Sequence, residues 1–182
     1  MSDSERPSWP KTERRRGADR RKGDRRAGGD RRKGDRRSEA GWQPVPLDGA
    51  PAVEESSLLT AARQARERAV APFSRFLVGA ALEAADGTIW TGCNIENASY
   101  SLTVCAERVA LLKALSEGVT AFTRLVVVAE TAAPTPPCGP CRQLLWEYCG
   151  DIPVIVANRQ ETLGRYALAD LLPLPFDRRL LR

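Results

Sequence analysis

The chain has 182 residues, with 28 Lys and Arg, 23 Asp and Glu, and no histidine. This length suits one domain of ordinary size with an additional segment. The lack of histidine excludes mechanisms that need an imidazole, so a metal must be held by Cys, Asp or Glu, and protons must be moved by Asp, Glu, Lys, Tyr or Cys.

The N-terminal segment carries the excess positive charge. Residues 1–50 contain 15 Lys and Arg against 9 Asp and Glu, whereas residues 51–182 contain 13 against 14. The octapeptide DRRKGDRR occurs twice in the segment with a period of 11 residues. So polar a stretch cannot bury enough surface to offset its ordering entropy. We therefore predict a disordered basic tail and linker over 1–53 and a folded catalytic domain over 54–182.

Two roles for the tail remain open. It could keep the protein in solution, or its positive charge could attach it to nucleic acid or another anionic surface. The regular Asp residues dilute that charge, and only Trp9 and Trp42 flank the repeats, so the repeats themselves offer no aromatic stacking platform. The nearly neutral domain favours a small-molecule substrate.

Hydrophobic periodicity predicts alternating helices and strands in the domain. In chain order the predicted elements are a helix over 57–70, a strand over 76–83, a turn at Asp86-Gly87, a strand over 88–92, a helix over 103–117, a strand over 125–129, a helix over 138–148, a strand over 153–157 and a helical turn over 168–172. Because helices separate the strands after the first hairpin, we expect an α/β fold, a three-layer α/β/α sandwich around a mixed β-sheet.

Three cysteines and a glutamate form the most informative pattern. Cys138 and Cys141 are a Cys-x-x-Cys pair, whose spacing lets two sulfurs reach one metal, and Cys105 supplies a third sulfur. A structural zinc site has four protein ligands, while a catalytic site leaves one position open. Three cysteines with Glu107 close by therefore predict a catalytic zinc. Both groups of thiols begin predicted helices, where the helix dipole favours thiolates.

Glu107 and two arginines have predicted supporting roles. Glu107 lies two residues after Cys105, about 200° around a helix from it, so we expect a proton carrier and not a fourth ligand. Arg108 and Arg142 could offset the thiolate charge, and we predict that at least one donates to the sulfurs. A structural zinc with Cys93 or Cys149 as fourth ligand, and the absence of any metal, stay open as alternatives.

The cysteines also bear on the compartment. Their number, five, is odd, and the polar residues at the start of the chain do not read as a signal peptide, so we expect reduced thiols in the cytoplasm. No apolar run approaches the roughly 18 residues of a membrane span, so we expect no membrane partner.

Four segments now carry a resemblance to a known family. The chain is similar to the tetrameric, three-cysteine type of cytidine deaminase, in the cytidine/deoxycytidylate deaminase superfamily, over 71–82, 91–118, 136–148 and 171–176. The second segment contains CNIENASY and TVCAER, and the third contains PCGPCRQ. The resemblance implies a mixed β-sheet flanked by helices, one zinc ion per subunit, and a homotetramer whose subunits share their active sites.

The resemblance also implies a reaction and residue roles. The reaction is hydrolytic deamination of cytidine and 2′-deoxycytidine in pyrimidine salvage, in which Glu107 moves the proton and zinc-bound hydroxide attacks the base. The implied roles are zinc ligands Cys105, Cys138 and Cys141; proton shuttle Glu107; ribose-binding Asn94 and Glu96; base-stacking Phe76; and Ala98, Tyr100 and Phe176 in sites of neighbouring subunits.

Other functions remain under consideration. A blasticidin-type deaminase shares the three-cysteine site, but the complete CNIENASY segment favours a ribose-binding enzyme. A deaminase or binding protein for nucleic acid would use the basic tail, and a non-catalytic zinc protein would hold the metal without turnover. The chain departs from the family pattern at Phe73, where Tyr is frequent, and in its basic extension.

Overall fold

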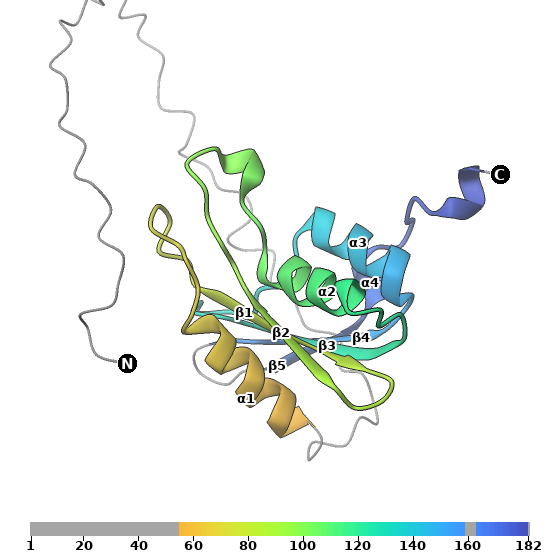
Figure 1. The fold of residues 1–182 in the computed structure, drawn as a ribbon, viewed down its shortest axis with the longest axis horizontal. Coiled ribbons are helices and arrows are strands. Elements are labelled where there is room, and N and C mark those ends of the chain that lie inside the picture. The colour runs from red at the N-terminus through yellow and green to blue at the C-terminus, as the bar shows by residue number, and fades with distance from the viewer. Residues whose placement is uncertain (1–54, 159–162, 182) are drawn as a thin grey trace, which may run out of the picture. The chain divides into compact units, whose positions relative to one another are not determined.

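The computed structural model describes residues 55–158 and 163–181 (Figure 1). The predicted tail and linker over 1–53 lie outside the described residues. In the described part, no helix is both long and apolar enough to cross a membrane.

A five-stranded mixed sheet forms the middle layer, with strand order β2-β1-β3-β4-β5. The pair β3 and β4 is parallel, and the three other neighbouring pairs are antiparallel. The strands are β1 (Val78–Ala84), β2 (Ile89–Cys93), β3 (Phe122–Ala129), β4 (Pro153–Ala157) and β5 (Leu163–Ala167). The expected mixed sheet is thereby confirmed.

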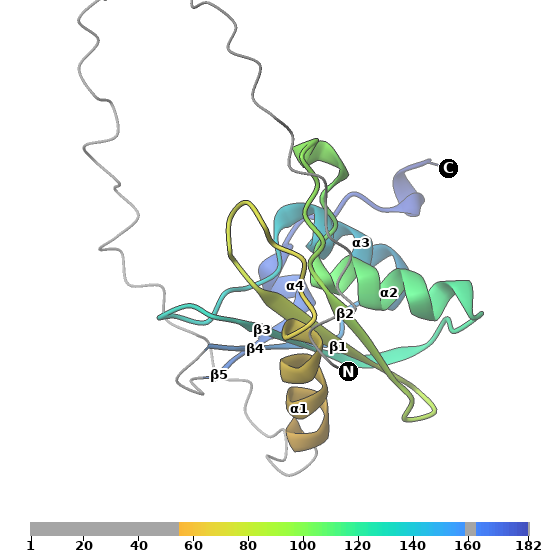
Figure 2. The ribbon, with the colours of Figure 1, turned by 60° about the vertical axis from the view of Figure 1, so that its left-hand side comes forward.

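Helices cover both faces of this sheet. Helix α1 lies on one face, and α2, α3 and α4 lie on the other (Figures 1 and 2). The helices are α1 (Glu55–Arg66), α2 (Ala106–Ser116), α3 (Gly139–Cys149) and α4 (Leu168–Leu171), with single 3-10 turns η2 (Tyr100–Leu102) and η3 (Arg178–Leu181). The predicted three-layer α/β/α sandwich is therefore correct.

The central strand β3 explains the two cores. Its alternate side chains point to opposite faces, so Leu125 and Val127 pack beneath α2 and α3, while Val126 and Val128 pack against α1. All four side chains are fully buried. A strand covered on both faces reads as a continuous apolar run, and this is why LVVVA was recognisable in the sequence.

Two glycines let helices approach the sheet closely. A Cβ atom at Gly79 of β1 would lie 2.0 Å from the carbonyl oxygen of Ala62 in α1, and one at Gly92 of β2 would lie 2.2 Å from that of Ala106 in α2. Neither site has room for a side chain. The second contact fixes the first turn of α2 over the sheet, next to Cys105.

Two sequence predictions need correction. The first helix ends at Arg66 and not near residue 70, because Val70 instead exchanges backbone hydrogen bonds with the Asn94–Glu96 segment. Strand β5 was missed, because LGRYA is short, contains glycine and arginine, and lies at the sheet edge, where apolar alternation is weak. The hairpin turn at Asp86-Gly87 is correct, with Gly87 at φ 84°.

Candidate zinc centre and substrate pocket

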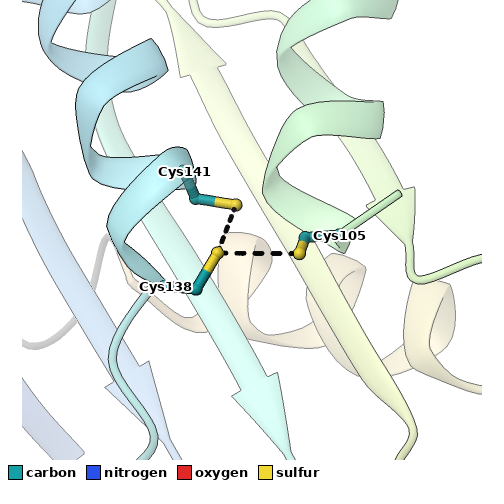
Figure 3. Close-up of side chains that lie close together, drawn as sticks. All are labelled: Cys105, Cys138 and Cys141. Atoms are coloured by element: carbon teal, nitrogen blue, oxygen red, sulfur yellow. Dashed lines mark hydrogen bonds between the residues drawn. The ribbon is translucent and has the colours of Figure 1, made fainter. Parts of the chain in front are cut away.

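Three sulfur atoms meet between the first turns of α2 and α3. The Sγ atoms of Cys105 and Cys138 are 3.7 Å apart, and those of Cys138 and Cys141 are 3.3 Å apart. All three sulfurs lie within 4.8 Å of one another. Figure 3 shows the three side chains pointing toward a common centre.

The helix starts place these thiols. Cys105 and Cys138 are the N-cap residues of α2 and α3, with extended backbone angles, and Cys141 lies in the first turn of α3. Pro140 follows near the beginning of α3, where its missing N–H costs no helical hydrogen bond. The positive ends of two helix dipoles therefore converge on the sulfurs.

The spacing of the sulfurs fits a tetrahedral metal. A Zn–S bond of about 2.3 Å requires sulfur atoms about 3.8 Å apart in a tetrahedron, close to the separations found. No fourth cysteine or carboxylate of the described residues joins the cluster. The alternative with Cys93 or Cys149 as fourth ligand is therefore not supported, and the donor set is that of a site with one open position.

The thiols are electrostatically linked. Hydrogen bonds from the Cys141 and Cys138 thiols, together with the charge of Arg108, lower the pKa of Cys105 to about 6. The pKa of Cys141 is raised, first by its interaction with Cys105 and then by burial, and burial also raises the pKa of Cys138. Three thiols this close oppose one another's ionisation, and a bound divalent cation would let all of them ionise.

Glu107 lies beside this cluster in the first turn of α2. Its side chain is only 5% exposed, and burial raises its pKa to about 7, helped by the negative charge of Cys105. It does not belong to the group of potential metal ligands. A carboxyl group with this pKa can both accept and release a proton near neutral pH.

A cavity of about 220 Å³ opens above the cluster. It brings together six residues that the sequence analysis singled out: Phe76, Asn94, Glu96, Cys105, Glu107 and Cys138. Side chains of β1 and β3, including Val78 and Val127, line it as well. No Lys or Arg is among the described lining residues, so the cavity suits a neutral, partly apolar ligand.

Asn94 and Glu96 are held by the chain that leads into β1. The side chain of Asn94 donates to the carbonyl oxygen of Phe76 and accepts the N–H of Val78, both at 2.8 Å. The carboxylate of Glu96 accepts the N–H of Phe73 at 2.9 Å and is also bonded to Ser74. The Ser74 hydroxyl is the main reason that the pKa of Glu96 is lowered.

Three predicted substrate contacts lie outside the cavity of this chain. Ala98, Tyr100 and Phe176 are exposed, and none of them lines it. The ring of Tyr100 instead lies 6.2 Å from that of Phe73. Their predicted contacts with a neighbouring subunit's site stay predictions.

The two arginines donate mainly to backbone carbonyls. Arg108 donates to the carbonyl oxygen of Thr103 at 2.7 Å, and Arg142 donates to those of Pro137 at 2.6 Å and Leu171 at 2.8 Å. These bonds hold the backbone just before Cys105 and just before Cys138. Support of the thiolates by Arg108 stays a prediction, favoured by its charge near Cys105.

Sequence reasoning missed three hydroxyl groups at the site. Thr103 and Thr135 line the cavity, and Ser74 bonds to Glu96. Thr103 lies two residues before Cys105 in the sequence, so its position next to the cysteine pattern was a usable signal. Nothing in the local pattern marks Ser74 or Thr135, because each comes to the site through a loop.

Comparison with known proteins gives the family. The family described as "Cytidine and deoxycytidylate deaminase zinc-binding region" matches residues 53–157. The chain is 48% identical over 127 residues to a cytidine deaminase of Sporosarcina psychrophila, covering 69% of this chain and 93% of the relative. It is 49% identical over 125 residues to a cytidine deaminase of Halalkalibacterium halodurans, covering 68% and 95%. The chain belongs to the cytidine and deoxycytidylate deaminase family.

A solved structure of the same family agrees in fold. The cytidine deaminase from Burkholderia pseudomallei superimposes with a TM-score of 0.65 at 46% identity, over 66% of this chain and 97% of that one. The span matched to the family's zinc-binding region includes all three clustered cysteines and Glu107. The basic segment before residue 53 lies outside it.

Proposed function

We propose that this chain catalyses the zinc-dependent hydrolytic deamination of cytidine and 2′-deoxycytidine, giving uridine or 2′-deoxyuridine and ammonia. The observation that carries the proposal is the placement of a three-thiol cluster and a buried carboxyl group against one cavity whose described lining contains no Lys or Arg. Membership of the family supports the reaction class.

Cys105, Cys138 and Cys141 would hold one zinc ion per subunit. A zinc ion bound there supplies an acidified water as nucleophile near neutral pH. The three thiolates would give the centre a net negative charge, which weakens that effect. Arg108 would offset part of this charge, and Arg142 would fix the turn that carries Cys138 through its bond to Pro137.

Glu107 is the proposed proton shuttle. Its carboxylate would take a proton from the attacking water and deliver it to ring nitrogen 3. It would then take a second proton, from the hydroxyl group added at carbon 4, and deliver it to the amine, which leaves as ammonia while carbon 4 becomes a carbonyl. Burial keeps the pKa of this carboxyl near neutrality, which suits a group that must both accept and donate within one turnover. Burial also keeps bulk water from exchanging with the transferred proton.

Phe76, Asn94 and Glu96 are the proposed nucleoside contacts. The ring of Phe76 would stack on the base, while Asn94 and Glu96 would bind the sugar hydroxyls. A carboxylate and an amide accept and donate in ways that only hydroxyl-bearing sugars satisfy. Ionised Glu96 at the cavity, with no cation among the described lining residues, favours a nucleoside over its monophosphate.

A homotetramer with shared active sites completes the proposal. Ala98, Tyr100 and Phe176 would reach the sites of neighbouring subunits. Support comes from their exposure and from the exposed apolar side chains near them, including Phe73 and Leu102. Exposed apolar side chains that lie together on a surface are typical of regions that become buried on association.

The tail and the compartment are further parts of the proposal. The basic segment over 1–53 is proposed as a separate unit that the reaction does not need, and the five free cysteines favour the cytoplasm. A protein without residues 1–50 should deaminate cytidine at the full rate. Loss of turnover together with loss of salt-dependent polynucleotide binding would favour the nucleic-acid alternative.

Ammonia release from cytidine by the zinc-loaded protein tests the proposed reaction. The wild type should turn over, and Glu107→Ala should retain its zinc and its melting temperature while losing roughly 10²- to 10⁴-fold in kcat. A variant that retains near wild-type turnover would refute the shuttle role. No turnover by the zinc-loaded wild type on either nucleoside would refute the function and favour a structural or blasticidin-type site.

A further inference from the structure

The connection between α1 and β1 lies beside the connection between β2 and α2 (Figures 1 and 2). Both connections contribute residues to the cavity, Phe76 from the first and Asn94 and Glu96 from the second. Backbone hydrogen bonds join the two connections: Val70 donates to the carbonyl oxygen of Asn94, and Glu96 donates to that of Val70. This leaves the Glu96 side chain facing residues 73 and 74. The carboxylate that lines the cavity is therefore held by Phe73 and Ser74, to which the sequence analysis gave no role.

Ser74 is the centre of this arrangement. The Ser74 hydroxyl donates to Oε1 of Glu96. Its oxygen, Oγ of Ser74, accepts the N–H of Phe76 at 3.0 Å. One hydroxyl group thus links the carboxylate of Glu96 to the backbone of Phe76, and both residues line the cavity. Among the described residues, Ser74 is the one donor to Oε1, whereas Oε2 also receives the backbone N–H groups of Phe73 and Ser74.

The network closes through Asn94. Its amide donates to the carbonyl oxygen of Phe76, so Phe76 is fixed by Ser74 at its N–H and by Asn94 at its carbonyl. Arg75, between Ser74 and Phe76, has φ 59°, a left-handed conformation that is unfavourable for a residue with a side chain. A strained backbone conformation of this kind persists only where surrounding contacts impose it.

We propose that Ser74 is a positioning residue for sugar recognition: its hydroxyl holds the Glu96 carboxylate and the Phe76 backbone in one arrangement, so that the pocket selects nucleosides whose sugar carries free hydroxyls. This inference rests on the proposed function. Glu96 is an acceptor with lone pairs to spare after its loop contacts, and a substrate hydroxyl can donate to them only if the carboxylate stays in place. Without the Ser74 hydroxyl, Oε1 loses its donor and the carboxylate can rotate about its last bond.

The experiment compares two substrates with three variants. In Ser74→Ala, KM for cytidine should rise about tenfold, the effect of losing roughly one charge-assisted hydrogen bond, while kcat changes less than about twofold. The comparison substrate is 2′,3′-dideoxycytidine, which lacks the hydroxyl groups at sugar carbons 2′ and 3′. The preference in kcat/KM for cytidine over this substrate should fall about tenfold in Ser74→Ala. Ser74→Thr retains the hydroxyl and should restore the preference.

Controls separate this role from a general structural one. Ser116→Ala removes a hydroxyl at the end of α2, which bonds to the carbonyl oxygen of Lys113 far from the cavity, and should leave both KM values unchanged. Equal changes for both nucleosides in Ser74→Ala, an unchanged KM for cytidine, or no restoration by Ser74→Thr would each overturn the inference while the proposed function stands. A wild type without cytidine turnover would overturn both.

Discussion

The sulfur atoms of Cys105 and Cys138 lie 3.7 Å apart although 33 positions separate the two residues. Each is the N-cap of its helix, and the two helices lie on the same face of the sheet. The fold therefore brings two helix N-termini together at one point. That point is where a thiolate-bound cation gains most from the backbone dipoles.

Removing one of these sulfurs should abolish metal binding. In Cys138→Ser, the zinc content measured by elemental analysis should fall from about one per subunit to below roughly a tenth, since two thiols and a neutral hydroxyl bind zinc poorly. The melting temperature should fall as well, because zinc that binds only the folded state adds to its stability.

Cys149→Ala is the matched control for this prediction. Cys149 lies at the end of α3, its pKa is raised to about 12 by burial, and it does not belong to the cluster. This variant should retain full zinc content and lose only about 1 kcal/mol of stability through the smaller side chain. Full zinc in Cys138→Ser would show that the metal sits elsewhere.

Glu83 and Arg124 should make stability depend on pH in the acid range. They face each other across β1 and β3, with Nε of Arg124 donating to Oε2 of Glu83 at 2.6 Å. The Arg124 guanidinium holds the pKa of Glu83 below its ordinary 4.5. A carboxyl with a lowered folded-state pKa contributes stability above its unfolded pKa and loses it as the pH falls through the folded value.

Glu83→Gln should accordingly lower the free energy of unfolding by about 1–2 kcal/mol at pH 7, measured by urea unfolding. A cost of this size is expected because both side chains of the pair are largely buried. The difference from wild type should shrink as the pH falls below about 4.5, the ordinary pKa of the group. Glu117→Gln, at the exposed C-terminal end of α2, should lack this cost at pH 7, because a carboxylate gains nothing from the negative end of the helix dipole. A cost of Glu83→Gln that stays constant down to pH 3 would contradict the pairing.

The sequence allowed the clustering of the three cysteines to be predicted better than the edges of the fold. The cysteines were recognisable because metal ligands must be particular residue types at particular spacings, and β3 because a strand buried on both faces is uniformly apolar. Strand β5 was missed because its short sequence, LGRYA, has little apolar alternation, and the end of α1 was misplaced because Val70 pairs with the distant Asn94–Glu96 segment. Ser74 was missed for the same reason: its partner Glu96 is 22 residues away, on another loop.

Gly79 should tolerate no side chain. A Cβ atom there would lie 2.0 Å from the carbonyl oxygen of Ala62 and 2.5 Å from the backbone N of Arg66, so α1 would have to move off the sheet. Gly79→Ala should destabilise the protein by roughly 3 kcal/mol or more, as overpacking against backbone does. Thermal unfolding measures this loss.

Gly139→Ala provides the contrast for that measurement. Nothing lies within 4 Å of a Cβ at Gly139, which is the first residue of α3. Alanine there should leave the melting temperature unchanged or raise it slightly, because glycine is the poorer helix former by about 1 kcal/mol. Similar losses in both variants would mean that close approach of α1 is not the reason for glycine in β1.

Subunit mixing should reveal whether active sites are shared. Glu107→Gln leaves a subunit without its shuttle, and Phe176→Ala leaves it without the exposed ring proposed to close a neighbour's site; Phe176 is 58% exposed in a single chain. Each variant alone should be strongly impaired. When both are co-expressed in equal amounts, sites that draw Glu107 from one subunit and Phe176 from another should return about a quarter of wild-type activity, as random assembly of a symmetric oligomer predicts.

Leu181→Ala is the control in that experiment, because Leu181 lies in the same C-terminal segment and is 74% exposed but has no proposed role at the site. This variant alone should keep its turnover. If instead each site is built from one chain, every subunit in the Glu107→Gln and Phe176→Ala mixture carries one defect in its own site. Activity then stays at the average of the two separate variants, and the proposal of shared sites fails even if the protein is a tetramer.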